Sequence, residues 1–223
     1  MLWYVYMKYN LPKGYLSSSA CDLWETNANA YREKYYLKQR GFASPYTDFG
    51  KWFADDIEKN PAKYPNIPKG DIGEFPVKWT IEGVPVLGYL DSFCTKTKTI
   101  FEYKTSIVKG TDSWSQVKVQ KWKQLPFYAM SIHSMFGKFH PVIKLVVMQT
   151  EWADICKETR FGNKLIVECD KRLQFAAGSL DSPVIYERTI ALWEVKAMKQ
   201  RLVKIASEIS TDYTQWQLET AKV

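Results

Sequence analysis

Three consecutive strand patterns between residues 74 and 105 constrain the fold of this chain most. Residues 74–81 alternate apolar and polar side chains, Glu82–Gly83 supplies a turn, and residues 84–94 resume an extended apolar pattern. This arrangement is typical of a β-hairpin. Residues 99–105 predict a third strand, joined to the second by a tight hairpin near residues 95–98.

The segments beside these strands predict helices and one irregular connection. Three serines at the start of residues 17–40 precede a spacing that fits an N-capped helix with an aromatic face. A second helix is expected over about residues 48–59, and the proline- and glycine-rich residues 60–73 should be a connection. Apolar residues recur every three to four positions over residues 113–137, which predicts a long amphipathic helix. Pro126 lies inside it and predicts either a kink or a helix start.

The rest of the chain completes a mixed sheet. Residues 141–148 are apolar and β-branched and predict a buried strand, with a further strand at about 164–169 and a closing helix over about 187–209. Strands interrupted by one crossover helix imply an α/β fold with a mixed central sheet and helices on both faces. The length of 223 residues fits a single domain.

Composition restricts the class of protein only loosely. The 31 Lys and Arg residues exceed the 24 Asp and Glu residues, so the formal charge of +7 suits a polyanionic partner, although many ordinary basic proteins share it. No apolar run approaches the ~18 to 20 residues that span a bilayer, so we expect a soluble, unexported protein in the cytoplasm. The four cysteines form no CxxC pair, and no histidine has zinc-ligand spacing. We expect reduced, mostly buried thiols.

An acid–x–lysine pair follows an acidic residue on the preceding strand. Glu102 and Lys104 are two residues apart and therefore point to one face, and the hairpin can bring Asp91 beside Glu102. Two adjacent carboxylates repel each other unless a divalent cation such as Mg²⁺ or Mn²⁺ lies between them. Taken alone, the spacing describes solvated hairpin charges more often than a site. The apolar Ile100–Phe101 and the small Gly88 favour a site. A lysine beside two metal-binding carboxylates suggests metal-assisted hydrolysis of phosphodiesters.

Three short motifs resemble one known family. Residues 88–91 read Gly-Tyr-Leu-Asp, residues 101–105 read Phe-Glu-Tyr-Lys-Thr, and residues 124–129 read Gln-Leu-Pro-Phe-Tyr-Ala. Together they resemble the RecB-type exonuclease branch of the PD-(D/E)xK nuclease superfamily, including its phage relatives. Residues 16–36 are similar to the N-terminal helix motif of that branch, but lack its cysteine–proline pair. The resemblance covers about residues 16–150, and it implies the cytoplasm of a bacterium or a phage-infected host cell as the setting of the protein.

This resemblance implies a restriction-endonuclease-like core over about residues 46–170, within one nuclease domain. It implies that Asp91 and Glu102 bind one or two Mg²⁺ or Mn²⁺ ions, with the Tyr103 carbonyl as a further candidate ligand. Lys104 would be the catalytic lysine.

The third motif implies supporting residues. Thr105 ends the strand motif, and Gln124 and Tyr128 are four apart, so they share a helix face that can address the site or the DNA backbone. The alternative is that both belong to an ordinary helix surface.

One position departs from the pattern of the branch. A histidine often stands four residues after a glycine in the helix before the first strand, whereas Gly50 is followed by Ala54. Glu58 lies one turn beyond Ala54 on the same face and is the first candidate for the missing metal ligand. Asp55, rotated by about 100°, is the second candidate, and plain solvated charges are an equal alternative.

Histidine and iron–sulfur chemistry are not indicated. His133 and His140 fall at a helix end and in a loop, where structural roles are expected. The iron–sulfur relatives of the branch cluster three cysteines near the C-terminus, whereas Cys156 and Cys169 are separated by twelve residues. We therefore expect no iron–sulfur cluster.

Lysines and tryptophans mix in the long predicted helix. Lys118, Lys121 and Lys123 lie close to Trp122, which suits a basic channel with stacking platforms for unpaired bases. The apolar helical spacing of the tryptophans favours a place in the core instead.

The expected function is a metal-dependent DNA nuclease, an exonuclease in recombination, repair or end processing, with DNA and possible recombination or repair proteins as partners. The strandedness of the DNA stays open. The alternatives are an accessory that keeps the nuclease fold and binds nucleic acid without cutting it, and an RNA-directed nuclease.

Overall fold

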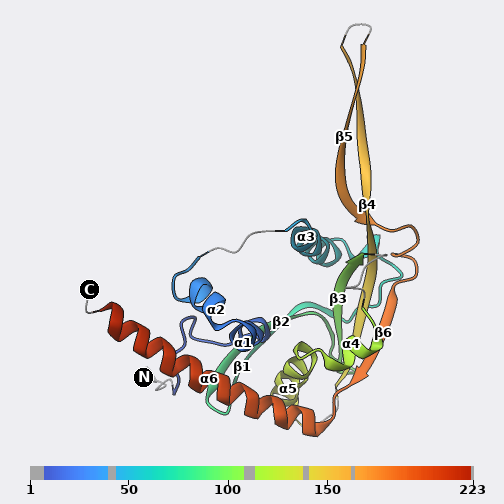
Figure 1. The fold of residues 1–223 in the computed structure, drawn as a ribbon. Helices are drawn as coiled ribbons and strands as arrows, with labels where there is room; N and C mark the ends of the chain where they lie inside the picture. The colour runs from blue at the N-terminus through green and yellow to red at the C-terminus, as the bar shows by residue number, and fades with distance from the viewer. Residues whose placement is uncertain (1–7, 40–43, 108–113, 138–140, 162–163, 222–223) are drawn as a thin grey trace, which may run out of the picture.

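The computed structural model describes residues 8–39, 44–107, 114–137, 141–161 and 164–221. The chain has an α/β fold with an open, mixed sheet of six strands flanked by helices (Figure 1). The strand order is β1-β2-β3-β4-β5, and β6 also pairs with β4. Among the strands of the described residues, β3 and β4 are parallel and the other pairs are antiparallel. The strands are β1 Ile72–Ile81, β2 Val84–Cys94, β3 Thr99–Ile107, β4 Val142–Phe161, β5 Lys164–Phe175 and β6 Val184–Thr189.

Helices cover both faces of the sheet. Strand residues alternate between the faces: Leu145 packs with α1, α5 and α6, whereas Val146 packs with α3. The core on the side of α1, α5 and α6 is larger than the core on the side of α3. The helices are α1 Ser18–Thr26, α2 Ala28–Tyr35, α3 Pro45–Lys59, the 3₁₀ turn η1 Pro61–Lys63, α4 Gln116–Lys121, α5 Gln124–Phe136 and α6 Leu192–Thr220.

Two helices that the sequence predicts as continuous are each divided. Asn27 has φ −157° and ψ 86°, and its side chain accepts a hydrogen bond from the Ala30 N–H, so it ends α1 and caps α2. Trp122 is extended, with φ −75° and ψ 113°, and separates α4 from α5. Pro126 consequently lies in the first turn of α5, where its missing N–H breaks no helical bond. The helix start, one of the two alternatives, is therefore confirmed.

The C-terminal third differs most from the prediction. Residues 184–189, partly assigned to the closing helix, form β6 along the first half of β4, and α6 begins only at Leu192. β4 and β5 run well past their predicted ends and continue as a two-stranded ribbon beyond the sheet (Figure 1). The apolar residues of β6 fit an edge strand as well as the start of a helix, and propensity alone does not distinguish the two.

The cysteine prediction is wrong for one pair. Cys156 and Cys169 are register partners in the ribbon, with Cα atoms 4.0 Å apart, and form a disulfide. Cys21 is a buried free thiol, and Cys94 is a half-buried one. The pairing needs the β4–β5 register, which the cysteine spacing does not reveal.

No helix in the described part of the chain is long and apolar enough to cross a membrane.

Candidate active site

The site forms where β2 and β3 separate. The two strands pair from Cys94↔Thr99 to Ser92↔Phe101. The next position on β2 is Asp91, which no longer follows the ladder: its Oδ2 accepts a hydrogen bond of 2.7 Å from the Tyr103 N–H. The charge of Asp91 acts on Glu102, so the two carboxyls lie near each other, as the hairpin predicts.

Glu102 is the centre of a polar cluster. It is only 1% exposed, and its Oε1 accepts hydrogen bonds from Lys104 Nζ at 2.7 Å and from Gln124 Nε2 at 3.1 Å. The Gln124 amide also donates to the Tyr128 hydroxyl at 2.6 Å. Glu102 Oε2 is buried and has no hydrogen-bond partner among the described residues. One oxygen of a buried carboxylate is thus satisfied twice and the other is left open.

Burial and mutual repulsion favour the protonated carboxyls. Burial, and then the charge of Asp91, raises the pKa of Glu102 to about 7 against the opposing effect of Lys104. Burial also raises the pKa of Asp91, although Lys104 and the Tyr103 N–H oppose it. Burial acts to lower the pKa of Lys104, but the two carboxylates outweigh it and raise that pKa. The lysine therefore stays charged, but its single positive charge cannot balance two ionised carboxylates.

Helix α3 borders the site from the other side. A cavity of about 290 Å³ beside Asp91 and Lys104 is lined by Gly50, Ala54 and Thr105. Position 54 therefore faces the candidate site, and so does Thr105. A second cavity, of about 220 Å³, is shared by Asp91 and Glu58 and is also lined by Gly70, Gly73 and Ser92.

The two candidate replacements for the missing histidine differ in position. Glu58 is exposed and shares its cavity with Asp91, whereas Asp55 pairs with Lys59 Nζ at 3.3 Å on the exposed surface of α3. No three His, Cys, Asp or Glu side chains within the described ranges are grouped to hold a metal ion. Metal ligation by Glu58 or Asp55 stays a prediction.

Glu74 is a neighbour of the site that sequence reasoning missed. The β1–β2 ladder passes from Gly73↔Ser92 to Phe75↔Leu90, so Glu74 is the unpaired residue next to Asp91, with φ 41°. Burial raises its pKa, and so do the charges of Glu58, Asp55 and Asp91. In the sequence Glu74 is one polar residue of an alternating strand, and only the register reveals its place.

The remaining predicted residues fall as follows. The Tyr103 ring packs against α3, and its hydroxyl donates to the Pro68 carbonyl. Metal ligation by the Tyr103 backbone carbonyl stays a prediction. His133 lies at the C-terminal end of α5, far along the helix from Gln124, and His140 lies outside the described residues. Gln124 and Tyr128 belong to the cluster and not to a plain helix surface.

Comparison with known proteins finds no protein-family model and no curated protein that matches the sequence.

Proposed function

We propose that this chain is a metal-dependent nuclease with a restriction-endonuclease-like core, of the RecB-type branch of the PD-(D/E)xK superfamily. The observation that carries the proposal is the unsatisfied, buried Glu102 Oε2 beside Asp91 and Lys104. Buried polar atoms normally have partners, so an open carboxylate oxygen in a functional position requires an explanation. A bound cation explains it.

The order of elements supports the same class. Helix α3 precedes the antiparallel β1, β2 and β3, and the α4–α5 segment then crosses over to β4, parallel to β3. This is the order of helix, three strands, crossover helix and strand that the sequence patterns predict, and it forms the mixed sheet flanked by helices that suits the core type implied by the resemblance. Function depends on the site and not on the fold, so the order supports the proposal without carrying it.

The residues present fit a hard divalent cation. Glu102 Oε2 and the Asp91 carboxylate offer oxygen ligands, which suit Mg²⁺ or Mn²⁺. Bound there, the ion would supply an activated water and neutralise charge on the phosphate. A bound cation would also lower the pKa of Glu102, because it stabilises the ionised carboxylate against the effects of burial and of Asp91.

The protein groups around the cluster hold it in place. Lys104 keeps its ammonium 2.7 Å from Glu102 Oε1, where it can also meet a phosphate oxygen. The Gln124 amide fixes the same carboxylate from α5, and the Tyr103 N–H fixes Asp91. These contacts leave the open oxygen of Glu102 as the free position of the site.

The proposed substrate is DNA and the proposed mode is exonucleolytic, in recombination, repair or end processing. A second candidate is an accessory that binds nucleic acid without cutting it. The alanine at position 54, which faces the site where the branch often has a histidine, favours that candidate. Cleavage of RNA is a third outcome of the same experiment.

The test is incubation of the purified chain with linear, circular and single-stranded DNA and with RNA, each with Mg²⁺, Mn²⁺ or EDTA. We expect cleavage that needs the metal and spares circular duplex DNA. Asp91→Ala, Glu102→Ala and Lys104→Ala should each abolish it, while Glu33→Ala, at an exposed position on α2, serves as the control. Undiminished turnover in a folded site variant would reject the assignment, and metal-independent binding without cleavage would favour the accessory.

A further inference from the structure

Trp122 lies between α4 and α5 and contacts Lys104, the candidate catalytic lysine. Lys104 Nζ lies over the Trp122 ring, 5.3 Å from its centroid. We propose that Trp122 is a positioning residue that holds the Lys104 ammonium against Glu102, and that it does not act as a stacking platform for a nucleobase. The inference rests on the proposed nuclease function.

Lys104 needs such a restraint. A lysine carries its charge on a flexible four-carbon chain, and the side chain of Lys104 is 31% exposed although its partner Glu102 is buried. The hydrogen bond from Lys104 Nζ to Glu102 Oε1 fixes the nitrogen at a single point. An aromatic face beside the ammonium attracts it through the ring quadrupole and limits its swing into solvent.

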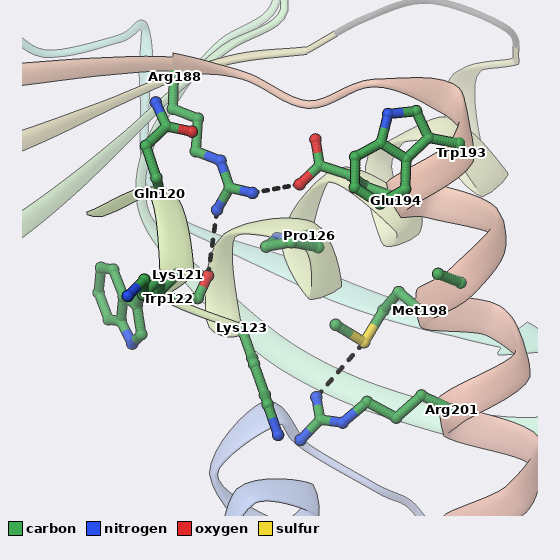
Figure 2. A pocket seen from close by; sticks show the side chains of 11 residues that line it. Gln120, Lys121, Trp122, Lys123, Pro126, Arg188, Trp193, Glu194, Met198 and Arg201 are labelled. Atoms are coloured by element: carbon green, nitrogen blue, oxygen red, sulfur yellow. Dashed lines mark hydrogen bonds and ion pairs between the residues drawn. The ribbon is translucent and has the colours of Figure 1, made fainter. Parts of the chain in front are cut away.

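The backbone of Trp122 is anchored from the side away from the site. Its N–H donates to the Val119 carbonyl, and its own carbonyl accepts from Arg188 Nη1 at 3.4 Å. Arg188 is buried and ion-paired with Glu194 at the start of α6. Trp122 and Pro126 both line a pocket of about 260 Å³ against α6, and Figure 2 shows the Trp122 indole on the opposite side of its own backbone from Pro126. The fixed backbone therefore holds the ring on the side of the chain away from Pro126.

A second tryptophan supports the ring. The ring centroids of Trp114 and Trp122 are 4.7 Å apart at 52°, and the Trp114 carbonyl accepts from the Tyr186 hydroxyl of β6 at 2.8 Å. Lys118 Nζ lies 5.0 Å from the Trp114 centroid. The contacts with Lys104 and Trp114 occupy part of the ring surface of Trp122, which is half-buried, and on this ground we assign it a positioning role.

The kinetic test compares Trp122→Leu and Trp122→Phe with the parent in full-length protein. Leucine removes the ring and should lower kcat about tenfold, as expected for loss of a partly buried cation–π contact. Phenylalanine keeps a smaller ring and should lower kcat about threefold, since its weaker quadrupole retains part of the attraction. KM and the affinity for DNA in EDTA should stay unchanged in both variants. Trp193→Leu, which removes a 72% exposed indole on α6, should leave kcat unchanged.

Several results would overturn the positioning role. They are an unchanged kcat in Trp122→Leu, equal losses in both variants, or a loss confined to KM and affinity, the last being the sign of base stacking. If Trp122→Leu does not fold by circular dichroism, Trp122→Phe decides alone, and a parental kcat overturns the proposal.

A second measurement does not depend on nuclease activity. Acylation of lysines at one fixed pH, quantified by mass spectrometry, should label Lys104 severalfold faster in Trp122→Phe than in the parent, with Lys34 as the internal reference. Unchanged labelling of Lys104 would reject the packing role even in an active nuclease. Faster labelling in a protein without any nuclease activity would instead reject the proposed function and keep the contact.

Discussion

Replacement of Glu102 by glutamine should stabilise the metal-free protein, and by more at pH 8 than at pH 5. Burial, followed by the charge of Asp91, raises the pKa of Glu102 from 4.5 to about 7 in the folded state. A raised carboxyl pKa favours folding below the unfolded value, and this contribution is lost as the pH rises through the folded value. Above pH 7 the folded parent must hold a buried carboxylate without its cation, whereas glutamine is neutral at every pH.

The size of the effect follows from the two pKa values. Linkage at about 1.4 kcal/mol per pH unit predicts that the difference in unfolding free energy between Glu102→Gln and the parent grows by about 2.5 kcal/mol between pH 5 and pH 8. Constant effects of the substitution cancel in this comparison, since the amide oxygen of the new side chain can still accept from Lys104 and Gln124. The change with pH therefore reports mainly the titration of Glu102 together with the groups coupled to it.

The assay is urea unfolding in EDTA at pH 5, 6, 7 and 8, with Glu33→Gln on the exposed face of α2 as the control. The control difference should not change with pH. A difference between Glu102→Gln and the parent that stays constant across this range would refute the reasoning. Addition of Mg²⁺ or Mn²⁺ at pH 8 should stabilise the parent and leave Glu102→Gln nearly unchanged, because a ligand that binds only the folded state adds to its stability.

Three other expectations concern the metal, the substrate and the ribbon. Glu58→Ala should raise the metal concentration needed for half-maximal cleavage, while Asp55→Ala should not, because Glu58 shares a cavity with Asp91; a metal titration with the reverse result would identify Asp55 as the ligand. DNA affinity, measured in EDTA by fluorescence anisotropy, should fall steeply between 50 and 200 mM salt, roughly 10³-fold if six phosphates are contacted, and a flat dependence would argue against a phosphate-tracking groove. Proteolysis without reductant should yield linked peptides containing Cys156 and Cys169, and mass spectra that show only the separate free peptides would contradict the disulfide.

Local sequence patterns locate most of the central sheet because each signal acts over a few residues. The Glu82–Gly83 turn and the alternation around it specify β1 and β2, since both depend on neighbours in the chain. The breaks at Asn27 and Trp122 escape local patterns for the same reason. Both positions fit a helical spacing, so the apolar pattern runs across them, although Asn27 is an N-cap residue for α2 and Trp122 has an extended backbone.

The long-range features cannot be read from propensity. β6 forms because β4 presents a free edge to residues 184–189, and an edge strand of six residues has little pattern of its own. The pairing of Cys156 with Cys169 requires the register of a ribbon whose length the sequence does not indicate. These features depend on which segments meet, and tertiary context decides that.

In the polar cluster too, sequence spacing predicts some of the contacts, and the others depend on the strand register. The spacing of Glu102 and Lys104 predicts that they share a face, and their 2.7 Å contact agrees with it. Gln124 also lies where a shared helix face would put it. The position of Glu74 and the open Oε2 of Glu102 depend on where the strands separate, and no spacing rule gives that point.

Without a cation, the two buried carboxyls of the candidate site destabilise the folded state. Glu102 is held by Lys104 and Gln124 through one oxygen only, and its neighbour Asp91 adds repulsion rather than support. A core selected for stability alone would replace this arrangement with apolar side chains, because a buried carboxylate needs compensation that the described protein groups supply only in part. The cluster is formed by residues of β2, β3 and α5, and the apolar residues of these elements pack on both sides of it. Their packing offsets part of the free-energy cost of the buried carboxyls. The two carboxylates are thus held close together before any ion arrives, and a divalent cation would meet a preorganised pair of ligands whose repulsion it removes.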